Sequence, residues 1–358
     1  MTGGDGTVIA GAFGAARPDR GARHPGTPWS RPGRRFQVAL ACTLVAGPLL
    51  AACGQGSLGA SRASAHLRRT GASQATSTTA PAPAPAPTTT TTTVPPQPGW
   101  TVVASEPTGV AIDQRTVSLP DGTTVRVIRF RAHQVHFDLH DGSQDPPAGS
   151  AHLPPNALSA IAATEAPRLL AAFNGGFKVT TNAGGTEIDG QVLTPLQPGM
   201  ASFVIDASGQ GSIGVWGQPG FPPAGTQVVS VRQNLPPLVQ NGAPSPNAGT
   251  WTAWGATVTN ISTVARSALG EDAAGNLMYA ASASALPIDL AQALVSAGAV
   301  IGMELDINPD WVQADVASSP GGPLTADIPG QYPPATQYQS GWSRDFVAVL
   351  ANGSPATG

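Results

Sequence analysis

The stretch GMELDINPDW, residues 302–311, holds the side chains of this sequence best suited to chemistry. Glu304 and Asp306 follow an apolar run at a spacing of i, i+2. In an extended strand this spacing places both side chains on one face, with Cα atoms about 6.5 Å apart. Paired carboxylates at such a range can act as general acid and base, because the charge of one raises the pKa of the other. We therefore predict catalytic roles for Glu304 and Asp306, with hydrogen bonds that fix a turn as the alternative.

Asn308 and Asp310 extend the same polar stretch, and we predict that they bind substrate. Together with Asp306 they also spell D-x-N-x-D, the start of a calcium loop. The rest of that loop is missing, because Trp311 stands where glycine is needed and Ala317 stands where glutamate is needed. The sequence predicts no metal site and no cofactor, and it leaves a nonstandard calcium site open.

Three histidines, His133, His136 and His140, lie in the run TTVRVIRFRAHQVHFDLHDG, residues 123–142. The alternation of apolar and polar residues in this run predicts a strand pair or one long bent strand. On one strand His136 and His140 are about 13 Å apart, which is too far for two side chains to share an ion comfortably. We interpret them as solvated strand side chains.

Two units of a helix followed by a strand are predicted to position the polar residues. The first helix begins at Asn156 and leads into the strand LLAAF, residues 169–173. The second begins near Ile288, ends at Gly298 and leads into the strand AVIGMELD, residues 299–306. Ligands gather outside the carboxyl ends of strands in sheets built from such units, so the polar residues after both strands are expected to converge on one crevice.

The residues expected at that crevice include Asn174, Gly175, Gly176 and Phe177, which follow the first strand. The backbone amides of Gly175 and Gly176 can form a small anion nest. Arg266 can bind a phosphate bidentately, with a structural ion pair as the alternative. We predict that these residues bind substrate.

Between the two units the sequence alternates like strands. MASFVIDASGQGSIGVWG, residues 200–217, is typical of a hairpin with a turn at 207–210, and GNLMYAAS, residues 275–282, is typical of a further strand. We predict an α+β fold with a mixed β-sheet core.

The first part of the chain has the features of an export signal. An uncharged run at residues 36–50 follows Arg34 and Arg35 and is too short for a stable membrane anchor. It ends at Leu50-Ala51-Ala52-Cys53, which resembles a bacterial lipobox, in which Cys53 receives lipid. An ordinary signal peptide cut near Ala52 and a plain transmembrane anchor are the alternatives.

Composition divides the chain into three parts. Residues 1–52 are predicted to be a signal peptide with a long N-terminal extension, and residues 53–98 the lipidated cysteine with a disordered linker rich in Ala, Thr and Pro. Residues 99–358 are predicted to be one folded domain.

The predicted domain is acidic and has no cysteine. It contains 9 Lys plus Arg against 19 Asp plus Glu, a net charge of −10, and both cysteines of the chain, Cys42 and Cys53, precede it. The absence of cysteine excludes a disulfide, a Cys-zinc site and a thiol nucleophile within the domain. The charge argues against nucleic acid as a partner.

The order of several motifs resembles the phosphodiester glycosidase family, a group that includes the lysosomal enzyme that uncovers mannose 6-phosphate by removing N-acetylglucosamine. The resemblance covers about residues 120–352 and rests on AAFNGGF, MASFVID with its hairpin, NLPPLVQNG, ARSALG, the Leu305-Asp306 pair and SRDFVAVL. It implies that Asn174, Arg266 and Asp306 are site residues. The sequence departs from the family after Asp306, where Ile307 and Asn308 begin a stretch that is glycine-rich in the family.

The resemblance implies a hydrolase of the phosphodiester glycosidase type that acts outside the cytoplasm on a sugar linked through a phosphodiester in envelope glycans. The expected partners are that glycan and the membrane, which the protein contacts through a lipid on Cys53. The alternative is a noncatalytic glycan-binding or cell-wall-organising lipoprotein that keeps the fold.

Overall fold

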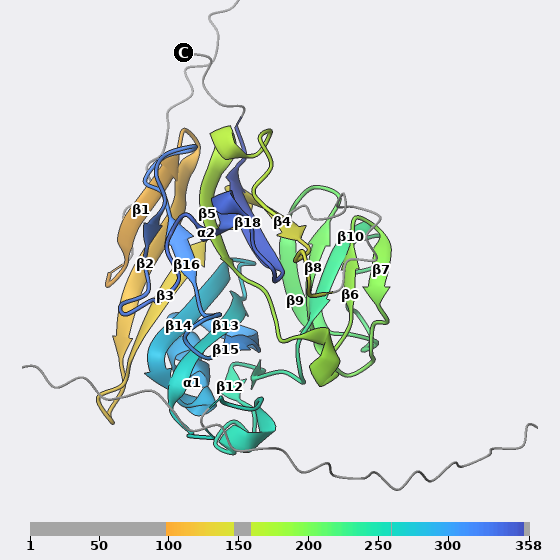
Figure 1. Ribbon diagram of the computed structural model, residues 1–358, viewed down its shortest axis with the longest axis vertical. Helices are drawn as coiled ribbons and strands as arrows, with labels where there is room; N and C mark the ends of the chain where they lie inside the picture. The colour runs from red at the N-terminus through yellow and green to blue at the C-terminus, as the bar shows by residue number, and fades with distance from the viewer. Residues whose placement is uncertain (1–97, 147–158, 259, 354–358) are drawn as a thin grey trace, which may run out of the picture. The chain divides into compact units, whose positions relative to one another are not determined.

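Three β-sheets form the structure, a computed structural model that describes residues 98–146, 159–258 and 260–353 (Figure 1). The signal segment and Cys53 lie outside these residues. The largest sheet has eight strands in the order β1 (Thr101–Glu106), β2 (Gly109–Ser118), β3 (Thr124–Phe130), β14 (Leu277–Ala285), β13 (Val264–Asp272), β15 (Ala299–Ile307), β11 (Val239–Gln240) and β12 (Ala243–Pro244).

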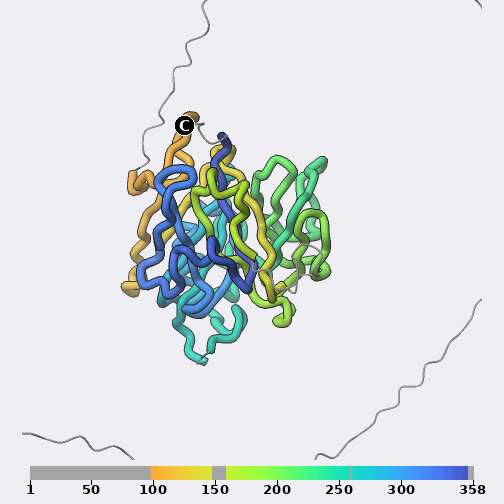
Figure 2. The backbone as a smooth tube through the Cα atoms, turned by 45° about the horizontal axis from the view of Figure 1, so that its top comes forward, coloured from red at the N-terminus to blue at the C-terminus, as the bar shows by residue number. Residues whose placement is uncertain are grey.

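The other two sheets have five strands each. One has the order β7 (Gln191–Thr194), β6 (Thr186–Ile188), β10 (Val228–Gln233), β8 (Ala201–Asp206) and β9 (Gly211–Val215). The other has the order β17 (Thr325–Ala326), β16 (Ala314–Val316), β5 (Leu169–Asn174), β18 (Phe346–Ala351) and β4 (Val135–His140). Figure 2 shows the blue C-terminal strand β18 between β4 and β5, with which it pairs.

Helices are few in the described residues. They are α1 (Pro287–Ala297), α2 (Gln337–Ser340) and the 3-10 turns η1 (Ala166–Arg168), η2 (Val179–Thr181) and η3 (Trp251–Ala253). No helix in this part of the chain is long and apolar enough to cross a membrane. The described fold is therefore mostly β.

The second predicted helix-and-strand unit is confirmed as α1 followed by β15. Asp289 accepts a hydrogen bond from the Leu286 N–H at 2.7 Å and caps the start of α1. Gly298 ends the helix with φ of 105°, a conformation that glycine adopts without strain. The inner face of α1 packs on the eight-stranded sheet through buried side chains that include Leu290 and Leu294.

The prediction of a mixed sheet is wrong. Every pair of named strands among the described residues is antiparallel, and the single parallel contact is an isolated bridge between Asp145 and Arg344. Parallel pairs need crossovers, usually helical, and α1 instead joins β14 to β15, which lie on either side of β13 in the sheet.

The first predicted helix is also wrong over the residues that are described, and its expected start at Asn156 lies outside them. Residues 159–165 form a bridge and a turn, and only η1 follows. The backbone instead pairs with the segment around α2, because the Trp342 N–H donates to the Ser159 carbonyl at 2.7 Å and the Ile161 N–H donates to the Tyr338 carbonyl at 2.9 Å. These bonds hold the chain extended before it enters β5.

The run 123–142 forms two strands, as expected, but they belong to different sheets. β3 lies in the eight-stranded sheet and β4 at the edge of a five-stranded sheet. The predicted hairpin at 200–217 is confirmed as β8 and β9.

One apolar core joins the three sheets. Phe130 of the eight-stranded sheet packs against Phe173 and Phe137 of the β5 sheet, with ring centroids 5.5 and 5.8 Å apart. Phe137 in turn contacts Phe203 of the third sheet at 5.8 Å. Met303 and Leu305 of β15 belong to the same core, so the strand is held rigidly just before Asp306.

Replacing Leu305 with alanine is expected to lower the free energy of unfolding by about 2–5 kcal/mol, since it removes buried methyl groups and leaves a cavity. Leu305 is only 2% exposed. Val300 of the same strand is 39% exposed, so Val300→Ala is the matched control and is expected to cost much less. Urea denaturation of both variants measures the difference, and equal costs would place Leu305 outside the core.

Candidate functional site

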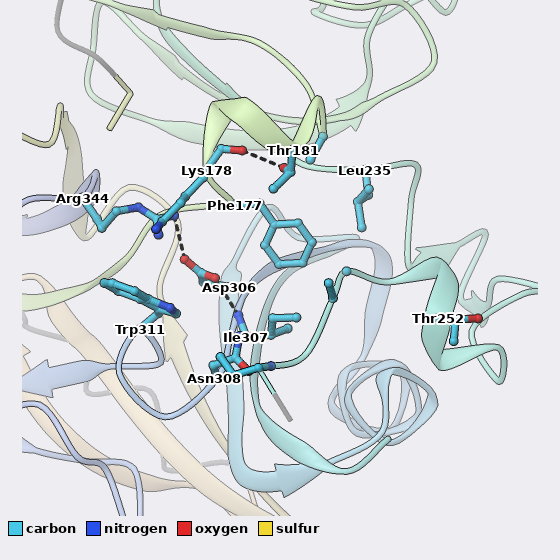
Figure 3. A pocket seen from close by; sticks show the side chains of 14 residues that line it. Phe177, Lys178, Thr181, Leu235, Thr252, Asp306, Ile307, Asn308, Trp311 and Arg344 are labelled. Atoms are coloured by element: carbon cyan, nitrogen blue, oxygen red, sulfur yellow. Dashed lines mark hydrogen bonds and ion pairs between the residues drawn. The ribbon is translucent and has the colours of Figure 1, made fainter. Parts of the chain in front are cut away.

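A pocket of about 520 Å³ opens beside the end of β15 (Figure 3). Segments from several parts of the chain contribute to its wall, which consists of Phe177, Lys178, Thr181, Ala183, Leu235, Thr252, Gly255, Ala256, Val258, Asp306, Ile307, Asn308, Trp311 and Arg344. Its size is typical of small-molecule sites.

Asp306 enters the pocket at a β-bulge. Along β13 and β15, Ala268 faces Glu304 but Arg266 faces Ile307, so β15 has one extra residue there. The Ser267 hydroxyl fills the irregularity, since it accepts the Asp306 N–H at 3.1 Å and donates to the Asp306 carbonyl at 3.0 Å. A bulge re-aims side chains, which breaks the simple alternation expected for this strand.

The Asp306 carboxylate is buried and paired. Oδ2 accepts a hydrogen bond from Arg344 Nη2 at 2.9 Å, and Oδ1 accepts the Ile307 N–H at 2.8 Å. Burial raises the pKa of Asp306 to about 7, although the Arg344 guanidinium acts in the opposite direction. Asp306 can therefore take up or release a proton near neutral pH.

Two cations accompany this carboxylate (Figure 3). The guanidinium carbon of Arg344 lies 5.0 Å from the centre of the Trp311 ring, and Lys178 Nζ lies 5.3 Å from it. Arg344 is buried, and its Nη2 also donates to the Gly176 carbonyl at 2.7 Å. Lys178 is exposed. This end of the pocket suits an anion.

Asn174 lies behind the pocket and is not one of the wall residues named above. Its Nδ2 donates to Ser267 Oγ at 3.0 Å, and its Oδ1 accepts the Tyr279 hydroxyl at 2.6 Å and the Gln313 N–H at 3.1 Å. Because Ser267 also holds the Asp306 backbone, Asn174 is connected to Asp306 through one hydroxyl. The structure therefore gives Asn174 the geometry of a positioning residue.

The two glycines after Asn174 contact Asp345. The Gly175 N–H donates to the Asp345 carbonyl at 3.0 Å, and the Gly176 N–H donates to Asp345 Oδ2 at 3.2 Å. The predicted anion nest is thus filled by the protein's own acidic residue. A side chain at Gly175 would collide with the Asp345 carboxylate, which explains the glycine there.

Arg266 and Glu304 form an ion pair away from the pocket wall. Arg266 Nη1 donates to Glu304 Oε1 at 2.6 Å and to the Trp254 carbonyl at 3.1 Å, and both side chains are 0% exposed. Burial raises the pKa of Glu304 to about 8, against the effect of Arg266. Glu304 and Asp306 were predicted to act together, but of these two carboxylates Asp306 alone is among the wall residues named above.

Phe177 and Asn308 line the pocket, whereas Asp310 is exposed and is absent from its described wall. Asn308 has φ of 76°, and its Oδ1 accepts the Val258 N–H at 3.0 Å. It therefore ends β15 and anchors the loop on the opposite wall.

The side chains that could ligate a metal ion lie close together at a place that is not part of the pocket wall. Within the described ranges, Asp138, His140 and Glu165 place one potential ligand atom each within 4.8 Å of one another. His140 Nε2 and Glu165 Oε1 are 3.2 Å apart, and Glu165 Oε2 accepts the Ala162 N–H at 2.8 Å. These contacts already satisfy the two side chains, and His136 instead contacts Arg168.

Sequence reasoning missed Lys178, Arg344, Asp345 and Arg232. Arg232 Nε donates to Asp345 Oδ2 at 2.6 Å, and this buried pair supports the turn at Gly175 and Gly176. Arg344 and Asp345 stand side by side in SRDF, just before a buried strand. Two adjacent charges at that place were the available signal.

No family model and no curated protein matches the sequence. Among solved structures, the chain is similar to the catalytic domain of zebrafish N-acetylglucosamine-1-phosphodiester alpha-N-acetylglucosaminidase auto-inhibited by its pro-peptide, with 15% identity over 71% of this chain and 88% of that one and a TM-score of 0.45. It is also similar to a hypothetical protein from Synechocystis, with 14% identity over 68% of this chain and 62% of that one and a TM-score of 0.40.

Proposed function

We propose that the pocket binds a sugar linked through a phosphodiester and hydrolyses the bond between the sugar and the phosphate. One observation carries the proposal: a buried carboxylate, Asp306, lies in the wall of a pocket of suitable size with two cations, Arg344 and Lys178. Burial, which raises the pKa of Asp306, supports it. The motif order in the sequence, which resembles the phosphodiester glycosidases, supports the same chemistry.

The cations receive the phosphate. Arg344 Nη1 makes no hydrogen bond to the residues at 98–146, 159–258 and 260–353, so it is available to a phosphate oxygen. Lys178 adds a second positive charge on a flexible stem. In this arrangement the anomeric carbon of the sugar lies next to Asp306.

Ionised Asp306 acts as the base. It takes a proton from a water molecule as the water oxygen attacks the anomeric carbon, and the bond from that carbon to the phosphate oxygen breaks. The electron pair of the broken bond leaves with the phosphate. The products are the free sugar and a phosphate monoester.

One carboxylate is enough for this reaction. Ordinary glycosidases need a second carboxyl group to protonate an alcohol as it leaves. A phosphate monoester has a second pKa near 6, so it leaves as an anion near neutral pH without that proton. Arg344 and Lys178 stabilise the charge that develops on it. The proposal therefore needs no acid at Glu304.

The predicted export signal and the motif that resembles a lipobox support a location outside the cytoplasm, with the domain held to a membrane through Cys53. An envelope glycan is the substrate that we propose for this location. Neither a metal ion nor another cofactor is part of the proposal.

Wild-type protein is expected to release free sugar and phosphate monoester from a panel of glycosyl-1-phosphate methyl esters. Lys178→Met is expected to raise KM about tenfold with little change in Tm, because it removes a charged contact to phosphate from an exposed position. Chromatography of the products and thermal melts give the two measurements.

The matched control is Arg115→Met, which removes a partly exposed cation that is not one of the pocket's wall residues. It is expected to leave KM unchanged. If wild type turns over no member of a broad sugar panel, the noncatalytic glycan-binding protein replaces the enzyme.

A further inference from the structure

The two ends of the pocket differ in character (Figure 3). Lys178, Arg344 and Asp306 gather at one end, beside Trp311. The remaining wall is mostly apolar and includes Phe177, Ala183, Leu235, Ala256, Val258 and Ile307. A ligand that fills the pocket therefore joins an anionic group to an apolar one.

Polar side chains are few on the apolar wall, and two of them are already engaged. The Thr181 hydroxyl donates to the Lys178 carbonyl at 2.6 Å, and Asn308 Oδ1 accepts the Val258 N–H at 3.0 Å. Besides Thr181, the described wall has one further hydroxyl side chain, Thr252, which is exposed. A sugar ring placed here would find few partners for its hydroxyl groups, and each hydroxyl buried without a partner costs free energy.

The rim of the apolar end includes an exposed apolar side chain. Val258 is 80% exposed although its backbone N–H is held by Asn308, and Ile261, three residues later, is 53% exposed. Because Val258 lines the pocket and is open to solvent, an apolar ligand that enters can cover its side chain and remove that surface from water. The apolar wall therefore continues out of the pocket to its rim.

We propose that the alcohol on the far side of the phosphate is an apolar chain of the alkyl or isoprenyl type. The inference rests on the proposed function for the phosphate end. With the phosphate at Lys178 and Arg344, the chain extends past Phe177 toward Val258. Hydrolysis breaks the bond between the sugar carbon and the phosphate oxygen, so the chain leaves as an alkyl phosphate.

Binding of alkyl phosphates tests the inference without any need for turnover. Calorimetry with methyl, propyl, butyl and hexyl phosphate is expected to show Kd falling about fourfold for each added methylene until the wall is covered.

Two variants locate the chain. Val258→Asn is expected to flatten the dependence of Kd on chain length, because it replaces the apolar rim with an amide. Val192→Asn is the matched control, since Val192 is 58% exposed and is absent from the described pocket wall. It is expected to keep the wild-type dependence.

Several results would overturn the inference: equal affinity for methyl and hexyl phosphate, no binding of hexyl phosphate, or an unchanged series in Val258→Asn. Turnover of methyl esters alongside any of these results would leave the proposed hydrolysis standing. The opposite combination, a clear chain-length series with no turnover of any ester, would support the apolar site and reject the hydrolase.

Discussion

Replacing Asp306 with asparagine is expected to lower the turnover of a glycosyl-1-phosphodiester by about 100-fold or more, because the amide cannot take a proton from water. Asparagine has nearly the same shape and keeps an acceptor for the Ile307 N–H, so the fold is retained. Turnover assays beside a urea denaturation curve measure the two effects separately.

The pH dependence gives a second signature of Asp306. Its pKa in the folded protein, about 7, lies above its ordinary value of 3.8. The base works when ionised, so kcat/KM is expected to rise with pH through about 7. Between the two pKa values the folded state binds more protons than the unfolded state, so the contribution of Asp306 to stability falls as pH rises, by at most about 1.4 kcal/mol per pH unit. Asp306→Asn removes this dependence and therefore gains stability relative to wild type as pH rises.

Asp189→Asn is the matched control, because Asp189 is exposed, lies outside the described pocket wall and has φ of 50°, which asparagine tolerates. Its turnover and pH profile are expected to match those of wild type. A variant Asp306→Asn that keeps full activity, or a wild-type profile without a rise near pH 7, would remove Asp306 from the reaction.

The part of the site that could be predicted from sequence is the part defined by local pattern. Apolar spacing and the glycine at 298 predict α1, and the apolar run after it predicts β15. These elements identify Asp306 as a polar residue at the end of a buried strand. The structure has the same elements there, and Asp306 is in the wall of a pocket.

The relation between Glu304 and Asp306 could not be predicted in this way. Strand periodicity places residues i and i+2 on one face, but the bulge opposite Ser267 interrupts that period. The bulge depends on a hydroxyl of a neighbouring strand, about forty residues away in sequence. A pattern read along one strand contains no information about it.

Arg344 was missed for a related reason. Its position in the pocket follows from β18 lying between β4 and β5, which begin far earlier in the chain. Such long-range pairing is decided by the packing of whole sheets. Over its described part, residues 159–165, the expected first helix fails similarly, because backbone pairing with residues 338–342 overrides the local spacing.

The pairing that brings β18 beside β5 also joins Arg232 to Asp345, and breaking this buried pair is expected to have the largest effect on stability. Both side chains are nearly unexposed, and their closest atoms, Nε and Oδ2, are 2.6 Å apart. Arg232→Met leaves the Asp345 carboxylate buried beside the Gly176 N–H without its cation, which is expected to cost about 3–5 kcal/mol. Urea denaturation measures the loss.

A double-mutant cycle separates the pair from the shape of the side chains. Because Asp345→Asn removes the buried charge, Arg232→Met is expected to cost clearly less in that background than in wild type. The matched control is Arg126→Met, whose partner Asp327 lies 3.4 Å away and whose side chain is 22% exposed, against 2% for Arg232. Solvent-exposed pairs contribute up to about 1 kcal/mol, so this partly exposed pair is expected to cost less than the buried one. If Arg232→Met costs no more than Arg126→Met, or costs the same in both backgrounds, the Gly175–Gly176 turn is held by its backbone bonds alone, and Asp345 has no need of a cation.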